Sequence, residues 1–102
     1  MKLPYAFKDV ALADLREIAT YTRKTWGKEQ EAIYIKGLFD CFERIATLET
    51  VNIDYSHIKS GCFKFKISHH LIIFQWLKDG RPEIIRVLHE SMDVPSQIAK
   101  AT

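Results

Sequence analysis

The period of the hydrophobic pattern changes once along this chain, close to Gly61. Before that residue, apolar side chains recur at spacings of three and four, which is typical of amphipathic helices. After it, Phe63, Phe65 and Ile67 alternate with small or basic residues, as in a strand with one buried face. The pattern therefore predicts helices in the first half of the chain and a sheet in the second.

The first helix is predicted to follow a short strand at residues 3–7. Asp9 stands where an N-cap residue accepts a hydrogen bond from a first-turn amide, and Gly27 stands where a helix ends. Residues at helical spacing form the apolar stripe: Ala11, Leu15, Ile18, Ala19, Thr22 and Trp26. Charged residues are expected mostly on the opposite, solvated side: Asp14, Arg16, Glu17, Arg23 and Lys24.

A second helix is predicted from residue 28, where two glutamates suit the positive end of a helix dipole. Its apolar residues keep the helical spacing over several turns: Ile35, Leu38, Phe39, Phe42, Ile45 and Ala46. The two helices form a hairpin around Gly27, and we expect a sheet as the third surface that their stripes need. Any apolar surface that stays exposed would form a groove for a partner. Residues 47–60 are predicted to be a loop with a short strand near Ile53.

A three-stranded antiparallel meander is predicted after this loop. Residues 62–67 form a strand with one basic face, and residues 70–77 are apolar on both faces, which is typical of a central strand. The Asp79-Gly80 pair favours a hairpin turn, after which residues 83–89 return. The order predicts an α+β fold with an N-terminal strand, a two-helix hairpin, the meander and a short C-terminal tail.

Composition limits the classes of protein. With 102 residues, 47% of them hydrophobic, the chain can bury one core, so we expect a single domain over residues 1–102. The net charge of +2 is too small for binding nucleic acid mainly through phosphates. Cys41 and Cys62 lack metal or redox spacing and suit a reducing compartment. Without a leader or an apolar run that could span a bilayer, a soluble cytoplasmic protein is predicted.

Positive charge is concentrated in the predicted sheet. Between residues 57 and 89, six basic residues accompany two acidic ones, a net charge of +4, so the remainder carries −2. All four histidines lie in the same half: His57, His69, His70 and His89. A basic sheet face would suit an acidic partner or a phosphate backbone. The alternative is a solvated strand face whose lysines discourage edge pairing.

The histidines do not form a recognisable metal site. His69 and His70 are adjacent on a predicted strand and so point to opposite faces. His70 and His89 could approach each other across neighbouring strands, but no third ligand accompanies them, so we predict no metal and no cofactor. The side-chain types that RNA cleavage needs are present: Lys64, Lys66, Arg86, His70 and His89. Their spacing forms no motif, and a histidine that hydrogen-bonds the backbone at a strand end is the alternative.

Several short motifs follow one another in a fixed order between residues 5 and 95. They are Ala11, Asp14-Leu15, Ile18 and Tyr21, then Trp26-Gly27, the second helix through Phe42, Gly61 with Phe63-Lys64-Phe65, residues 70–74, residues 85–89 and residues 92–94. Together they resemble the ParE family of toxin-antitoxin modules, within the wider RelE/ParE superfold. Residues 49–54 depart from that family in lacking its frequent proline and glycine. Lys64 stands where arginine is frequent and cannot reproduce a bidentate guanidinium contact.

The resemblance implies a toxin that binds DNA gyrase and blocks its cycle, with no chemistry of its own and no direct, specific nucleic-acid binding. It also implies a ParD-like antitoxin, which the basic sheet predicts to be acidic, that wraps the toxin in a hetero-oligomer. Two alternatives stay open, a ribosome-dependent mRNA endonuclease of the RelE type and a degenerate, non-toxic member. The residues predicted to recognise the target or the antitoxin are Lys64, Lys66, His70, Arg86, His89, Met92 and Asp93. The last four are also expected to form a clasp that closes the final strand and aims the tail.

Overall fold

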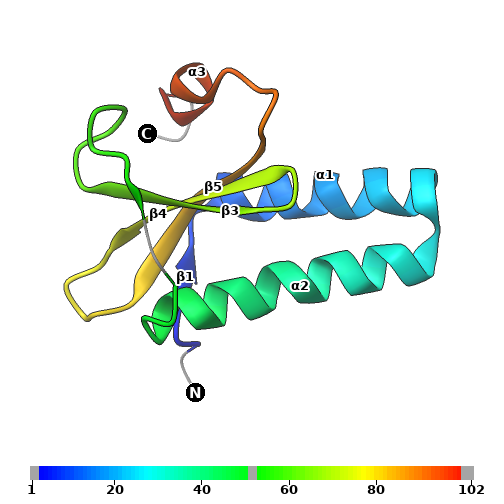
Figure 1. Cartoon of the computed structure of the whole chain (residues 1–102), viewed down its shortest axis with the longest axis horizontal. Helices are drawn as coiled ribbons and strands as arrows, with labels where there is room; N and C mark the ends of the chain where they lie inside the picture. Colours follow the sequence, from blue (N-terminus) through cyan, green and yellow to red (C-terminus); the bar gives the residue numbers. More distant parts are fainter. Residues whose placement is uncertain (1–2, 51–52, 100–102) are drawn as a thin grey trace.

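The computed structural model describes residues 3–50 and 53–99, which form a five-stranded sheet with helices on both faces (Figure 1). Helices α1 (Asp9–Trp26) and α2 (Lys28–Ala46) form a hairpin on one face, and the short helix α3 (Val94–Ala99) covers the other. The sheet order is β1-β5-β4-β3-β2, with bounds Ala6–Phe7, Ile53–Asp54, Cys62–Ile67, His70–Trp76 and Pro82–His89 for β1 to β5. β1 pairs parallel with β5, and the other neighbours are antiparallel. The predicted α+β fold is confirmed.

The start of α1 differs from the prediction by one residue. Lys8 is the N-cap, in extended backbone, and its N–H donates to the Ile84 carbonyl of β5 at 2.9 Å. Asp9 is therefore the first helical residue and makes no capping hydrogen bond, because pairing of the preceding residue with the sheet sets the point at which the helix begins. The other end agrees with the prediction. Gly27 has φ +95° and ψ 171°, a backbone region that is essentially restricted to glycine.

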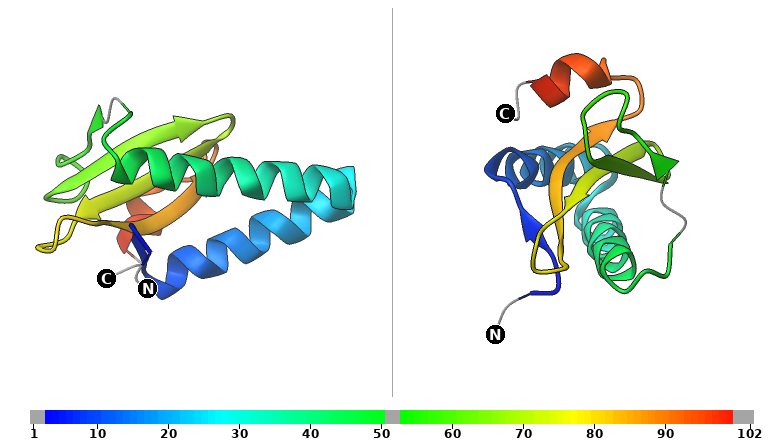
Figure 2. Two further views of the ribbon diagram at one scale, coloured as in Figure 1. Left: turned by 90° about the horizontal axis from the view of Figure 1, so that it is seen from below. Right: turned by 90° about the vertical axis from the view of Figure 1, so that its left-hand side faces the viewer.

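The closed end of the hairpin, where Gly27 joins α1 to α2, projects past the strands (Figure 2). Trp26, predicted to belong to the buried stripe of α1, is 68% exposed because no strand lies beneath it. Tyr21 and Ile33, from the same region of the two helices, are 67% and 63% exposed. Trp26 does have the helical spacing of the apolar stripe, but no strand of the sheet extends far enough to cover it.

Two cores lie on the two sides of the sheet. The core beneath α1 and α2 contains Ala11, Leu15, Ile18, Leu38, Cys41, Phe42, Ile45, Ile72, Phe74, Ile84 and Val87. The core beneath α3 contains Tyr55, Cys62, Ile73, Ile85, Leu88, Val94 and Ile98. Adjacent residues of β4 and β5 thus enter opposite cores, which confirms that the apolar strands are buried on both faces. The predicted tail contains α3, whose buried Val94 and Ile98 are four residues apart.

An irregularity in the pairing of β4 with β5 lies beside the residues of functional interest. Ile73 pairs with Arg86 and the next residue, Phe74, pairs with Ile84, so Ile85 is an extra residue in β5. Such a bulge bends the strand and changes the direction of the side chains around it.

No helix in the described ranges has the length and the apolar content needed to cross a membrane.

Candidate functional site: a histidine-lined pocket

A pocket of about 620 Å³ opens between the helical hairpin and the end of the sheet where β3 turns into β4. Its helical wall is mostly apolar and aromatic, from Ile18, Tyr21, Trp26 and Tyr34. The remaining lining residues are Asp14, Glu17, Thr22, Gln30, Ser68, His69, His70, Val87, His89 and Met92. The pocket therefore combines an apolar wall with a cluster of imidazoles at the sheet end.

The register of the strands brings the imidazoles together. His70 and His89 are directly opposite in the β4–β5 ladder, and their ring centroids are 5.4 Å apart. The prediction that these two could approach each other is confirmed. The prediction that His69 lies on a strand is wrong: His69 is in the turn after Ile67, where Ser68 has φ +52°. Because it leaves the strand geometry, the His69 ring turns back and stacks 6.2 Å from His89.

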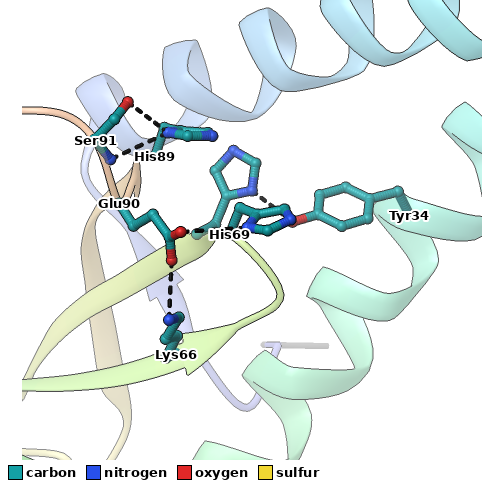
Figure 3. A network of polar contacts seen from close by, with 7 residues as sticks. Tyr34, Lys66, His69, His89, Glu90 and Ser91 are labelled. Carbon is teal, nitrogen blue, oxygen red and sulfur yellow. Dashed lines mark hydrogen bonds and ion pairs between the residues drawn. The ribbon is translucent and has the colours of Figure 1, made fainter.

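His70 is half-buried and bonded to the helical hairpin. Its Nδ1 lies 2.5 Å from the hydroxyl oxygen of Tyr34, which reaches in from α2 (Figure 3). Burial lowers the pKa of His70, and the neighbouring His89 and His69 lower it further. Burial also raises the pKa of the Tyr34 hydroxyl, which a hydrogen bond from Ser68 offsets in part. A neutral imidazole thus faces a protonated phenol at neutral pH.

His89 and Glu90 hold the other side of the cluster, as Figure 3 shows. The backbone N–H and the hydroxyl of Ser91 lie 3.1 and 2.7 Å from His89 Nδ1, in the turn that follows β5. Glu90 bonds Lys66 Nζ at 2.9 Å and His69 Nδ1 at 3.3 Å. Hydrogen bonds from Lys66 and His69 lower the pKa of the Glu90 carboxyl. Lys66 and His69 therefore share one carboxylate, which offsets the positive charge of Lys66.

Asp14 was predicted to lie on the solvated side of α1, but its side chain is buried against β5. It accepts hydrogen bonds from Arg86 Nε and Nη2, each at 2.8 Å, and from the backbone N–H of Val87 at 3.0 Å. Arg86 Nη1 donates to the Gln97 carbonyl of α3 at 2.7 Å. The hydrogen bonds to Asp14 raise the pKa of Arg86. This clamp ties α1, β5 and α3 together, so Arg86 does hold the tail, and it does not line the pocket.

The sequence contains a signal for the clamp. Asp14 follows Ala11 by three residues and precedes Ile18 by four, so it lies on the same helical face as the buried stripe. A carboxylate at such a position is buried only if it is paired, and Arg86 is the basic residue inside the apolar run of the last strand. Tyr34 also follows a helical pattern, but nothing local indicates that it meets His70, 36 residues away.

Comparison with known proteins decides the family. Residues 5–94 match the model of the ParE toxin of the type II toxin-antitoxin system, parDE. The chain is also 33% identical over 95 residues to Toxin ParE1 of Caulobacter vibrioides, covering 93% of this chain and 97% of that protein. The chain belongs to the ParE family. Toxin ParE of Escherichia coli is 33% identical, covering 93% and 92%, and Toxin ParE1 of Mycobacterium tuberculosis is 29% identical, covering 92% and 96%.

In this ParE-family chain, the predicted recognition residues divide into two groups. His70, His89 and Met92 line the pocket, and Lys66 joins them through Glu90 and His69. Lys64 lies on β3 away from the pocket lining, with its Nζ 4.5 Å from the centre of the Tyr55 ring. The exposed Asp93 precedes α3 and accepts a backbone hydrogen bond from Gln97. The pocket lining therefore contains three of the seven residues, and Lys66 is linked to it through Glu90.

The pocket of this ParE-family chain can bind a ligand through apolar contact and hydrogen bonding. Within residues 3–50 and 53–99, no group of three or more His, Cys, Asp or Glu side chains is placed to hold a metal ion. The guanidinium of Arg86 donates through Nε, Nη1 and Nη2 inside the clamp, so it is not directed toward a ligand. What the pocket offers a ligand is an aromatic wall and imidazole N–H groups.

Proposed function

We propose that this chain is a toxin that binds DNA gyrase and blocks its cycle, and that a ParD-like antitoxin neutralises it by occupying the histidine-lined pocket. Membership of the ParE family of type II toxins supports the toxin part of this proposal. The observation that carries the antitoxin part is the pocket of about 620 Å³ flanked by the strongly exposed Tyr21 and Trp26. Large apolar side chains left in water beside a groove are typical of a surface that a partner covers.

The hydrogen-bond and ion-pair partners of the basic side chains favour binding without chemistry over RNA cleavage. Cleavage of RNA needs a positive group beside the reacting phosphate as well as an acid and a base. Arg86 is committed to Asp14 and Gln97, and Lys66 is paired with Glu90. The cationic side chains nearest to the histidines thus already have anionic or carbonyl partners. As an inhibitor of gyrase, the protein would act in the bacterial cytoplasm.

Two parallel assays test the proposed target. Purified protein is added to a gyrase supercoiling reaction and to ribosomes that carry a defined mRNA. Loss of supercoiling with intact mRNA is expected. Cleaved mRNA with normal supercoiling would transfer the protein to the ribosome-dependent nucleases, and no effect in either assay would make it a non-toxic member of the family.

A pair of variants tests the proposed antitoxin surface. Trp26→Ala removes an exposed aromatic side chain from the pocket, and Ile33→Ala removes a similarly exposed aliphatic side chain from α2 outside the pocket. The antitoxin encoded beside the toxin gene is expected to bind Trp26→Ala about tenfold or more weakly, because buried aromatic anchors contribute about 2 kcal/mol or more. Ile33→Ala should bind as tightly as the original chain. Equal affinities for both variants would place the antitoxin elsewhere.

A further inference from the structure

The two facing histidines of the pocket have the same hydrogen-bonding arrangement. At His89, the backbone N–H of Ser91 can only donate, so Nδ1 must accept and the neutral ring carries its proton on Nε2. At His70, we assign the Tyr34 hydroxyl as the donor to Nδ1, because the raised pKa of that hydroxyl keeps its proton on the oxygen, and the ring proton is then again on Nε2. Both rings therefore have Nδ1 occupied by the protein and an Nε2–H group left for a ligand.

We propose that His70 and His89 form a carboxylate-binding site, which receives an acidic side chain of the polypeptide that fills the pocket. The ring centroids are 5.4 Å apart and the ring planes are nearly perpendicular, at 86°, so one carboxylate can lie within reach of both rings. Because a carboxylate only accepts hydrogen bonds, it matches two donors better than a hydroxyl or an amide does. This inference rests on the proposed function, since it names the group that the antitoxin presents.

The surroundings favour a polypeptide as the source of that carboxylate. The pocket wall extends along the helices to the strongly exposed Tyr21 and Trp26, so one small molecule bound at the histidines would leave these two side chains in water. The half of the chain between residues 57 and 89 has a net charge of +4, which attracts an acidic segment. The partner would place apolar side chains against the helical wall and its carboxylate at the sheet end.

Charged groups of every neighbouring element act on this site. From α1, Asp14 is neutralised by Arg86, whereas the exposed Glu17 lines the pocket and repels an incoming carboxylate. From α2 the Tyr34 hydroxyl faces His70, and beyond the strands Glu90 bonds both His69 and Lys66. Glu17 therefore leaves a negative charge at the pocket, and its removal should tighten binding.

A proton is expected to accompany the carboxylate. Burial and the two neighbouring imidazoles lower the pKa of His70 in the free chain, and a bound carboxylate would raise it again. Binding therefore takes up protons, and affinity for the acidic partner increases as the pH falls through the range in which histidine titrates. The sign is the reverse of that expected if the pocket bound only apolar groups while burying His70 further.

The first experiment uses the full chain and a small probe. The imidazole NMR signals are followed while 3-phenylpropionate is added, with the neutral 3-phenylpropionamide as the matched control. The carboxylate is expected to shift His70 and His89 but not the exposed His57, and to bind about tenfold more tightly than the amide, since hydrogen bonds to a charged group are the stronger ones. Equal binding of the two probes would overturn the proposal.

Variants make the same experiment specific. His70→Gln and His89→Gln should each remove the preference for the carboxylate, His57→Gln should retain it, and Glu17→Gln should strengthen it. If His70→Gln unfolds because Tyr34 loses its partner, the half-exposed His89→Gln still decides the question. An unchanged preference in His89→Gln would contradict the proposed site.

The natural complex separates this inference from the proposed function. The affinity of the antitoxin is measured at about pH 6 and about pH 8, where histidine changes its charge. Tighter binding at the lower pH, lost in His89→Gln, is the expected result. A stable complex with no such dependence would refute the carboxylate site and leave the antitoxin proposal intact. If no complex forms, the antitoxin proposal fails, and the small probe still decides whether the site exists.

Discussion

The clamp between Asp14 and Arg86 offers the sharpest test of the fold. The side chains are 8% and 11% exposed, and the carboxylate of Asp14 accepts three hydrogen bonds, two of them from the guanidinium. Asp14→Asn keeps the shape of the side chain but removes its charge and points an amide NH₂ at other donors. The positive charge of Arg86 then stays buried without an anion.

The expected loss of stability follows from the burial of the pair. Removing one partner of a buried ion pair costs about 3–5 kcal/mol, whereas an exposed pair contributes about 0–1 kcal/mol. Because Asp14 and Arg86 keep slight access to water and Asn retains one acceptor, we expect about 3 kcal/mol. For a domain of this size, that loss lowers Tm by about 12–24 °C.

Urea denaturation of matched variants measures this effect. Asp40→Asn is the control, because Asp40 pairs with Lys36 at 3.0 Å on the surface of α2, with side chains 54% and 76% exposed. The control should lose less than about 0.5 kcal/mol. A loss below about 1 kcal/mol for Asp14→Asn, with an unchanged urea dependence, would mean that the clamp does not hold α1 to the sheet.

Three further predictions concern the backbone, the histidine cluster and the core. Gly27→Ala should lose about 1–3 kcal/mol of unfolding free energy, because residue 27 has a φ of +95°. Gly37→Ala, inside α2 with open space around it, should gain about 0.5–1 kcal/mol. Equal changes in the urea midpoints of the two variants would refute this. Because the folded-state pKa of His70 is lowered, its contribution to stability is present above about pH 6.5 and is lost as the pH falls through the folded-state pKa. As the pH is lowered, the urea midpoint should therefore fall less steeply for His70→Gln than for the original chain. An identical slope for the two proteins would contradict this. Leu38→Ala should cost about 2–5 kcal/mol in thermal unfolding, against less than about 1 kcal/mol for the exposed Leu12→Ala.

The order of elements could be predicted because each apolar pattern has a single period over several turns or residues. The alternation after Gly61 and the apolar run from His70 specify β3 and β4, and Gly27 specifies the end of α1. The ends of elements were less certain where a tertiary contact decides them. Helix α1 begins at Asp9, after the N-cap Lys8, because the N–H of Lys8 pairs with β5, which no local signal for an N-cap could reveal.

The candidate site could be predicted only in part. The pairing of His70 with His89 follows from antiparallel strands, so the two could be placed together from the sequence. The approach of Tyr34 to His70 depends on how the hairpin crosses the sheet, and the exposure of Trp26 depends on how far the hairpin projects. Both are properties of tertiary packing between distant segments. A periodic pattern shows only which face of its own helix or strand is apolar, and not what packs against that face.

The central claim is that this ParE-family chain inhibits gyrase by binding and that an antitoxin releases that inhibition. The most direct measurement is supercoiling of relaxed plasmid by gyrase, with the toxin added alone or after incubation with the antitoxin encoded beside its gene. We predict that the toxin alone abolishes supercoiling and that prior incubation with an equimolar amount of antitoxin restores it. Full supercoiling in the presence of excess folded toxin would contradict the account.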